Sequence, residues 1–216
     1  AQEDRDWSRV VLLFSDERLV PLDDAESNYR MARETLIDQV RLPPPNVHPV
    51  PTHLPPIEAA AAYEVVLRGL LDPREPRLDL VLLGMGPDGH TASIFPGSRL
   101  LRHDGPLTGA PLSDAGPRPA RSARSARYDT EPLVAAVLDA PKPPPTRLTL
   151  TPYCINQARQ VLVLVTGEDK VAAVSAALES DADPEESPIR AIAPESGHLT
   201  WLIDRRAARA LTNPPR

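Results

Sequence analysis

The residues best suited to chemistry lie in the glycine-rich segment 84–93, GMGPDGHTAS, where one glycine separates Asp88 from His90. A neutral imidazole can take a proton from water, and a nearby carboxylate can hold the imidazole in one tautomer. We therefore interpret His90 as a general base and Asp88 as the carboxylate that orients it. A purely structural reading, in which His90 caps a helix and Asp88 stabilises the turn, is the alternative.

The glycines of this segment indicate what the two side chains would act on. Gly84, Gly86 and Gly89 let the backbone turn sharply and expose its N–H groups, and the chain is predicted to enter a helix near Thr91. Exposed N–H groups suit an anion or the oxyanion that develops in acyl transfer. Glycines also serve strand-to-helix packing, so the turn alone does not decide between the two roles.

Charged side chains follow two other predicted strands. Asp16, Glu17 and Arg18 come directly after an apolar run, and charges at the carboxyl end of a strand often point into a crevice. Arg18 is the candidate for binding an anionic substrate, with Asp16 beside it. Lys170 follows Thr-Gly-Glu-Asp at the entry of a predicted helix, where an ammonium suits a phosphate. A surface lysine is the alternative for Lys170.

Arginine far outnumbers lysine, with 22 arginines against Lys142 and Lys170 alone. Under such a compositional drift an unconstrained lysine is easily replaced, so the two that are present are slightly more informative. Cys154 is the single cysteine, which excludes an intramolecular disulfide and predicts one buried thiol in a reducing compartment. No spacing typical of metal ligands relates the histidines to one another or to Cys154, so no metal site is expected.

Apolar runs separated by helix-forming segments must position these residues. Strands are predicted at 9–14, 78–83, 147–151, 161–166 and 199–203, and helices at 27–40 with Ser27 as N-cap, 57–71, through Asn156, 169–178 and at the C-terminus. The alternation predicts a doubly wound α/β fold of Rossmann-like type, with a mainly parallel sheet and helices on both faces. Ligands bind beyond the carboxyl ends of such strands, so loops 15–18, 84–93 and 166–170 should converge on one crevice.

Length and composition limit the functional class. The 216 residues fit a single domain, 1–216, with a mobile insertion expected at 103–130 because proline, glycine, serine and arginine dominate there. A net charge of −6 and an aromatic content of 4% predict no nucleic-acid partner. No apolar stretch approaches a membrane-spanning length, and residues 1–9 lack the apolar core of a signal peptide, so we expect a cytoplasmic protein without membrane contact.

Several segments together resemble the 6-phosphogluconolactonase family. They are Phe14-Ser-Asp-Glu-Arg18 with Ser27-Asn-Tyr29, LDLVLLGMGPDGHTASIFPGS at 78–98, RLTLT with Asn156, and VTGEDK at 165–170. The match spans roughly residues 7–210, apart from the insertion, and GMGPDGHTASIFPG is its specific part. Glucosamine-6-phosphate deaminases of the same superfamily usually carry Asp-Glu-Tyr where this chain has Asp16-Glu17-Arg18, so Arg18 favours the lactonase.

The resemblance implies hydrolysis of 6-phospho-D-glucono-1,5-lactone to 6-phosphogluconate in the oxidative pentose phosphate pathway, without metal or organic cofactor. It also implies a small-molecule sugar-phosphate lactone as the partner, His90 as catalytic base and later acid, and Asp88 as its orienting group. The substrate-binding residues that we predict are Arg18, Asp16, Asn28, Gly86, Gly89, Asn156 and Lys170.

The chain departs from the family pattern at its N-terminal side, and this difference leaves alternative functions open. Family members usually begin with a further strand and a Ser-Gly-Gly-Ser-Thr-Pro-like phosphate loop, and no such loop occurs in the 216 residues. We therefore expect a chain that lacks the family's N-terminal strand and phosphate loop. The alternative functions are an amino-sugar-phosphate deaminase or isomerase of the same superfamily, and a non-catalytic sugar-phosphate-binding homologue.

Overall fold

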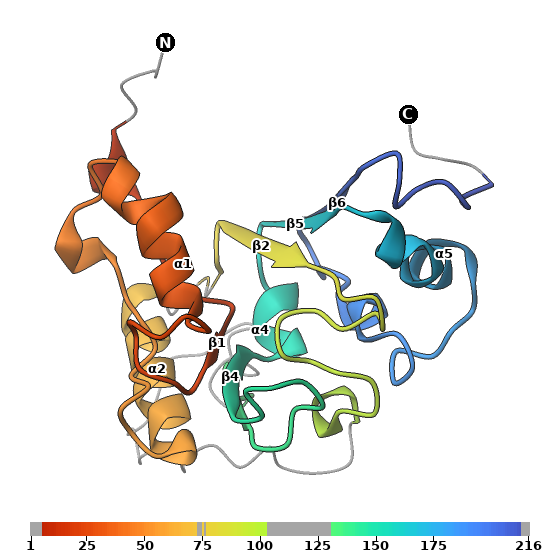
Figure 1. Cartoon of the computed structure of the whole chain (residues 1–216). Helices are drawn as coiled ribbons and strands as arrows, with labels where there is room; N and C mark the ends of the chain where they lie inside the picture. The colour runs from red at the N-terminus through yellow and green to blue at the C-terminus, as the bar shows by residue number, and fades with distance from the viewer. Residues whose placement is uncertain (1–5, 73–74, 76, 103–130, 213–216) are drawn as a thin grey trace.

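Two three-stranded sheets organise the chain, for which a computed structural model describes residues 6–72, 75, 77–102 and 131–212 (Figure 1). The strands are β1 (Asp16–Arg18), β2 (Leu80–Gly84), β3 (Val134–Val137), β4 (Arg147–Leu150), β5 (Gln160–Val165) and β6 (His198–Ile203). The α-helices are α1 (Asn28–Thr35), α2 (Pro56–Leu70), α4 (Pro152–Asn156) and α5 (Val171–Glu179). Short 3-10 helices are η1 (Trp7–Arg9), η2 (Ile37–Gln39), η3 (Pro44–Asn46), η4 (Arg99–Leu101), η5 (Glu168–Lys170) and η6 (Pro188–Ala191). The predicted insertion at 103–130 lies outside the described residues.

The first sheet is parallel, in the order β2-β5-β6, and it confirms the α/β fold with a parallel sheet. Its three strands coincide closely with the apolar runs predicted as strands 78–83, 161–166 and 199–203. Gly84 of β2 pairs with Leu164 of β5, which pairs with Leu202 of β6. The loops that follow β2 and β5 therefore leave from the same edge of the sheet, as the carboxyl-end rule requires.

Burial alternates along the parallel strands. Val81 and Leu83 of β2, with Val163 of β5, are buried in the core, whereas Leu80 and Leu82 are about half exposed. Continuous apolar strands are typical of a sheet covered on both faces, and the sequence therefore predicts helices on both faces. Within the described residues, the face of the sheet that carries Leu80 and Leu82 is instead exposed to solvent.

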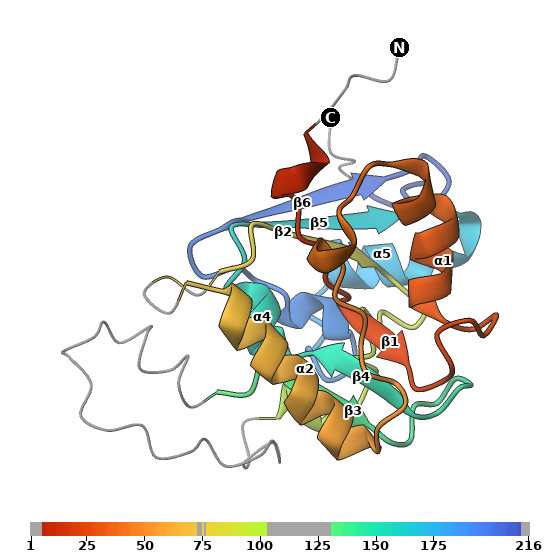
Figure 2. The ribbon, with the colours of Figure 1, turned by 90° about the vertical axis from the view of Figure 1, so that its left-hand side faces the viewer.

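The second sheet is antiparallel, in the order β1-β4-β3, and the sequence patterns did not predict it. Asp16 pairs with Thr149, and Val134 pairs with Leu150, so residues far apart in the sequence meet across β4. Figure 2 shows α2 lying against β3 and β4. Both sheets contribute to one hydrophobic core.

The predicted strand at 9–14 is wrong, and the strand begins instead at Asp16. Leu12 makes an isolated parallel bridge with Val47. The backbone N–H and C=O of Phe14 both hydrogen-bond the hydroxyl of Tyr63 on α2, at 2.7 and 3.3 Å, instead of a neighbouring strand. The apolar run is buried at its end, as predicted, but the backbone of Phe14 bonds a helix side chain and that of Leu12 bonds the segment 46–48.

The predicted helices have mixed outcomes. Ser27 caps α1 as predicted, since its side chain accepts a hydrogen bond from the N–H of Arg30. The predicted helix 57–71 corresponds to α2. The predicted C-terminal helix is wrong, because turns replace it after β6, where the Asp204 carboxylate accepts hydrogen bonds from the N–H groups of Gly167 and Ala207.

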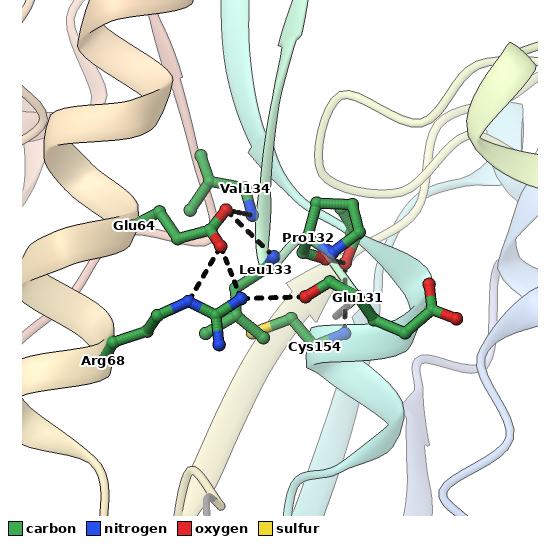
Figure 3. A network of polar contacts seen from close by, with 8 residues as sticks. Glu64, Arg68, Glu131, Pro132, Leu133, Val134 and Cys154 are labelled. Atoms are coloured by element: carbon green, nitrogen blue, oxygen red, sulfur yellow. Dashed lines mark hydrogen bonds and ion pairs between the residues drawn. The ribbon is translucent and has the colours of Figure 1, made fainter. Parts of the chain in front are cut away.

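A polar network fastens α2 to β3 (Figure 3). One oxygen of the Glu64 carboxylate accepts from the Nε of Arg68 at 2.9 Å, and the other accepts from the backbone N–H groups of Leu133 and Val134 at 3.2 and 3.4 Å. Arg68 also donates to the carbonyl of Glu131 at 2.9 Å. The charges thus bind backbone groups where β3 begins. We refer to Glu64, Arg68 and these backbone groups as the α2–β3 clamp.

Cys154 lies beside this clamp in the buried start of α4, as the single-thiol pattern predicted. Burial, with a smaller contribution from the charge of Glu64, raises the pKa of the Cys154 thiol to about 12. A thiol held in its protonated form is unreactive as a nucleophile, so Cys154 is a packing residue.

Candidate functional site

The glycine-rich segment forms a turn-rich loop directly after β2. The helix predicted near Thr91 is absent, because Thr91 and Ile94 pair in a tight antiparallel bridge and the Thr91 hydroxyl donates back to the carbonyl of Gly84 at 2.8 Å. Ala92 takes a positive φ of 47°, which reverses the chain. The loop therefore folds back on the strand that it leaves, and this places His90 and Asp88 at the carboxyl end of β2.

Gly86 and Gly89 shape this loop. A Cβ atom at Gly86 would overlap the His90 ring and the Asp88 carboxylate, and Gly89 adopts a φ of 77°, in the left-handed region that favours glycine. The N–H of Gly86 donates to the carbonyl of His90, and that of Gly89 donates to the carbonyl of Gly86. The expectation that these N–H groups face an oxyanion therefore needs correction, because the loop itself uses them.

Asp88 and His90 are in direct contact, as the sequence predicted. The Asp88 carboxylate hydrogen-bonds Nδ1 of the imidazole, and the ammonium of Lys142 lies 3.2 and 3.1 Å from the two carboxylate oxygens. The same ammonium is 3.3 Å from His90 Nδ1. We refer to these three side chains as the Asp88–His90–Lys142 cluster.

The charges of the cluster define the tautomer of the imidazole. Partial burial, the largest single influence, raises the pKa of Asp88, but the hydrogen bond and charge of His90 and the Lys142 ammonium outweigh it and place that pKa below its ordinary value. Asp88 is therefore an acceptor, and Nδ1 of His90 carries the proton. Nε2 then has a free lone pair, and no described residue hydrogen-bonds to it.

Burial is also the main influence on His90. It lowers the pKa of the imidazole below its ordinary value, with help from the charge of Lys142 and against the opposing pull of Asp88 and Asp16. The imidazole is consequently neutral near pH 7 and can accept a proton. The His90 side chain is only 19% exposed, while Lys142 is 40% exposed.

An aromatic ring supports the imidazole from one side. The Phe95 ring stacks on His90 with ring centres 4.6 Å apart and planes inclined by 30°. The guanidinium of Arg147 lies over the same Phe95 ring, 5.5 Å from its centre. These contacts connect the loop after β2 with the first residue of β4.

Asp16 also reaches this loop, from β1. Its carboxylate accepts from the hydroxyl of Ser93 at 2.7 Å and from the side-chain amide of Asn28 at 3.2 Å. Burial, opposed by the Ser93 hydrogen bond and by the charges of Arg18 and Arg147, raises the pKa of Asp16. The structure therefore brings two predicted site residues, Asp16 and Asn28, next to the loop that carries His90.

Arg18 has capacity left for a ligand. Its terminal nitrogen donates to the carbonyl of Glu26 at 2.6 Å, but its buried Nε has no hydrogen-bond partner among the described residues. The neighbouring position across the sheet is Arg147, which adds a second positive charge. A buried unpaired N–H is costly unless a ligand satisfies it.

Glu17, between these residues, has a structural task. The side chain is fully buried and accepts hydrogen bonds from the N–H groups of Arg18, Asn28 and Tyr29 and from the hydroxyl of Ser27. It ties the start of α1 to β1. The three charged residues 16–18 therefore have different roles: Glu17 binds backbone N–H groups, whereas Asp16 and Arg18 are candidates for substrate binding.

Two other predicted site residues, Lys170 and Asn156, lie in the helices that follow and precede β5. Lys170 stands at the end of η5 after β5, where its ammonium pairs with Asp169 at 2.9 Å. The amide of Asn156 is used by the backbone, because it donates to the carbonyl of Ala191 and accepts from the N–H of Ala193, both at 2.8 Å. Asn156 therefore fixes the segment after η6, and a role in lining a pocket stays a prediction.

The sequence interpretation missed Lys142, Phe95 and Arg147 as parts of the site. Lys142 stood out only because lysine is rare in this chain. No group of three or more potential metal-ligating side chains occurs within residues 6–72, 75, 77–102 and 131–212. Over the same residues, no helix has the length and apolar character needed to cross a membrane.

Comparisons with known proteins find related sequences and structures. The family model described as glucosamine-6-phosphate isomerases/6-phosphogluconolactonase matches residues 1–201. Human 6-phosphogluconolactonase is 39% identical over 210 residues, which cover 96% of this chain and 70% of the human protein. The crystal structure of 6-phosphogluconolactonase from Thermotoga maritima superposes with a TM-score of 0.70 at 30% identity, covering 94% of this chain and 76% of that one.

A solved structure of a monomeric glucosamine-6-phosphate deaminase shares the fold as well. Its TM-score is 0.67, and the superposed residues cover 94% of this chain and 76% of the deaminase chain, but the sequence identity is only 23%. At that level the likeness concerns the fold alone. The fold is therefore common to both reactions, and the site residues must distinguish them.

Proposed function

Because the chain belongs to the glucosamine-6-phosphate isomerase/6-phosphogluconolactonase family, we propose that it hydrolyses 6-phospho-D-glucono-1,5-lactone to 6-phosphogluconate in the pentose phosphate pathway. The observation that carries the proposal is His90, whose Nδ1 is held by a carboxylate while Nε2 keeps its lone pair. Hydrolysis of an ester-like bond is accelerated by such a base beside water.

The residues fit the steps of lactone hydrolysis. Nε2 of His90 takes a proton from water, and the hydroxide equivalent adds to the lactone carbonyl. The Lys142 ammonium lies on the Nδ1 side of the imidazole, so its positive charge favours the negative charge of the tetrahedral intermediate at longer range, without direct contact. When the bond between the carbonyl carbon and the ring oxygen breaks, His90 returns the proton to that oxygen, which leaves an open-chain acid.

The phosphate of the substrate needs cations outside this cluster. Arg18, with its buried unpaired Nε, is the best-supported candidate. Lys170 is the second candidate, because it follows the carboxyl end of β5, the strand that pairs with β2. We assign substrate binding to both, and we place Asp16 and Asn28 in the same pocket because Asp16 binds Ser93 in the loop of His90 and Asn28 binds Asp16.

Deamination or isomerisation of an amino-sugar phosphate is the second candidate, since the family includes isomerases. Arg18 favours the lactonase, because family members with the deaminase activity usually carry tyrosine at that place. A binding protein without activity is disfavoured by the intact Asp88–His90 pair. We propose a cytoplasmic location, no requirement for a metal or organic cofactor, and one domain over 1–216.

Parallel assays of the purified 216-residue chain test the proposal. Acid release from the lactone at mildly acidic pH, with spontaneous hydrolysis subtracted, should far exceed ammonia release or isomerisation of glucosamine 6-phosphate. Incubation with EDTA should leave the rate unchanged. Ammonia release without lactonase activity would establish the second candidate, and inactivity on both substrates would refute an enzymatic role.

A further inference from the structure

Arg147 is the most deeply buried cation beside the site, yet the mechanism above gives it no task. Only 5% of its surface is exposed, although it begins a strand at the sheet end next to the active loop. Burial, with the nearby charge of Arg18, lowers its pKa, and the charges of Asp16 and Glu26 oppose this effect. Burial of a guanidinium is costly, so its contacts must compensate.

Those contacts are with the backbone that carries Lys142. The Nε of Arg147 donates to the carbonyl of Pro144 at 2.9 Å, and a terminal nitrogen donates to the carbonyls of Lys142 and Pro143 at 3.1 and 3.2 Å. The planar fork of donors thus gathers three successive carbonyls. Because one of them belongs to Lys142, the guanidinium fixes the point from which that ammonium extends to Asp88.

A second route leads from Arg147 to His90. The guanidinium lies over the face of Phe95, and Phe95 stacks on the imidazole. Cations over aromatic faces are held there by the quadrupole of the ring. One guanidinium therefore contacts both supports of the imidazole, the Lys142 loop on one side and the Phe95 ring on the other.

We infer that Arg147 is a positioning residue, which holds Lys142 and Phe95 against the Asp88–His90 pair and thereby keeps the imidazole in its working orientation. This inference rests on the proposed lactonase function for its kinetic consequences, but the geometry of His90 can be tested without substrate. A general base displaced by about 1 Å can lose up to roughly 100-fold in rate.

Three variants separate position from charge. Arg147→Met removes both, whereas Arg147→Lys keeps a charge without the forked donors. Phe95→Leu breaks only the stacking route. The matched control is Arg77→Met, because Arg77 also binds carbonyls, those of Gln157 and Ser196 at 3.1 and 2.9 Å, but just before β2, at the opposite edge of the parallel sheet.

The first measurement is the NMR titration of His90 in the free protein, with its signal assigned by comparison with His90→Asn. The charged groups that face the imidazole are Asp88 from its own loop, Lys142 from the β3–β4 connection and Asp16 from β1. When the Lys142 loop and Phe95 loosen, His90 becomes more hydrated and loses a neighbouring positive charge. Its pKa should therefore rise in Arg147→Met and Arg147→Lys, and stay at the wild-type value in Arg77→Met.

The second measurement is the rate on the lactone. Both Arg147 variants should lose roughly 10- to 100-fold in kcat with little change in KM, and their acidic limb should move to higher pH. Arg147→Lys retaining the wild-type titration and kcat would overturn the inference, as would a loss confined to KM or a loss that only follows reduced thermal stability. If Arg147→Met does not fold, Arg147→Lys and Phe95→Leu decide together, because an unchanged His90 titration in both refutes the positioning role.

Failure of the proposed function gives a different pattern. In that case the wild-type chain lacks lactonase activity, while the His90 titration still differs between Arg147→Met and Arg77→Met. Identical titrations in all variants refute the positioning role whatever the reaction is.

Discussion

The α2–β3 clamp and the Asp88–His90–Lys142 cluster contain similar groups, but the first has a structural role and the second a chemical one. Each contains a carboxylate paired with a cation, and each connects segments that are distant in the sequence: the Glu64–Arg68 pair within α2 binds the start of β3, and Asp88 pairs with Lys142. In the clamp, the carboxylate and the guanidinium are both bound to backbone groups of one strand start (Figure 3). In the cluster, the same kind of ion pair acts on an imidazole and leaves its Nε2 without a partner among the described residues.

The difference shows how buried charge can be stabilising or functional. A network that uses its donors and acceptors on backbone contributes to structure, because any change leaves an unsatisfied group. A network that leaves one lone pair available, on an imidazole that is neutral at pH 7, can exchange protons with a substrate. Mutations in the two regions should therefore affect different quantities.

The largest expected effect is on catalysis at the cluster. His90→Asn should lower kcat on the lactone by about 10²- to 10⁴-fold, the usual contribution of a general base. The melting temperature should change little, because the ring is partly exposed. Initial rates and circular dichroism melts measure both. A variant with the wild-type rate would remove His90 from the mechanism.

The clamp should respond in the free energy of unfolding. Glu64→Ala leaves the Arg68 guanidinium and the N–H groups of β3 without their carboxylate, which should cost about 3 kcal/mol in urea denaturation. Its kcat should be that of the wild type at temperatures where the variant is folded. Glu34→Ala is the control, because it removes a solvent-exposed pair with Arg30, which contributes little to stability. Equal losses in both variants would contradict the assignment of the clamp.

Lys170→Ala tests whether the phosphate site extends along the sheet edge. Loss of a charge-assisted contact of about 1.5–3 kcal/mol should raise KM for the lactone by roughly 10- to 100-fold with little effect on kcat. Arg159→Ala provides the comparison, since Arg159 directly precedes β5 and so lies at the other end of the strand. An unchanged KM would show that Lys170 is a surface lysine.

The smallest effect is the pH dependence of the wild type. Because burial lowers the pKa of His90, the imidazole is neutral at pH 7 and protonates only below its ordinary value of about 6.5. Accordingly kcat/KM should be level near neutrality and fall about tenfold per pH unit on the acidic side. Glu64→Ala should show the same acidic limb. A limb that lies above pH 7 would contradict the neutral imidazole.

Local pattern predicted the parts of this molecule that depend on neighbours in sequence. The strand before Gly84, the cap at Ser27 and the contact of Asp88 with His90 all lie within a few residues. Lys142 could not be placed in the same way, because it meets Asp88 across 54 positions and only the pairing of β3 with β4 brings it there.

The same reasoning explains the misplaced elements. The apolar run before Asp16 has the composition of a strand, but the hydroxyl of Tyr63, 49 residues away, takes the hydrogen bonds of Phe14. The residues after His90 lack a helix because Thr91 bonds back to Gly84. In both places a tertiary contact overrides a local preference.

The scarcity of lysine gives the site a chemical signature. Besides the N-terminus, the chain has two primary amines, one in the Asp88–His90–Lys142 cluster and one after β5. An acylating reagent selective for amines therefore modifies few positions, and Lys142, whose side chain is 40% exposed, is the more accessible of the two. Covalent labelling followed by peptide mass spectrometry would report occupancy of the pocket directly, without an assay of turnover, because a bound sugar phosphate would shield that amine.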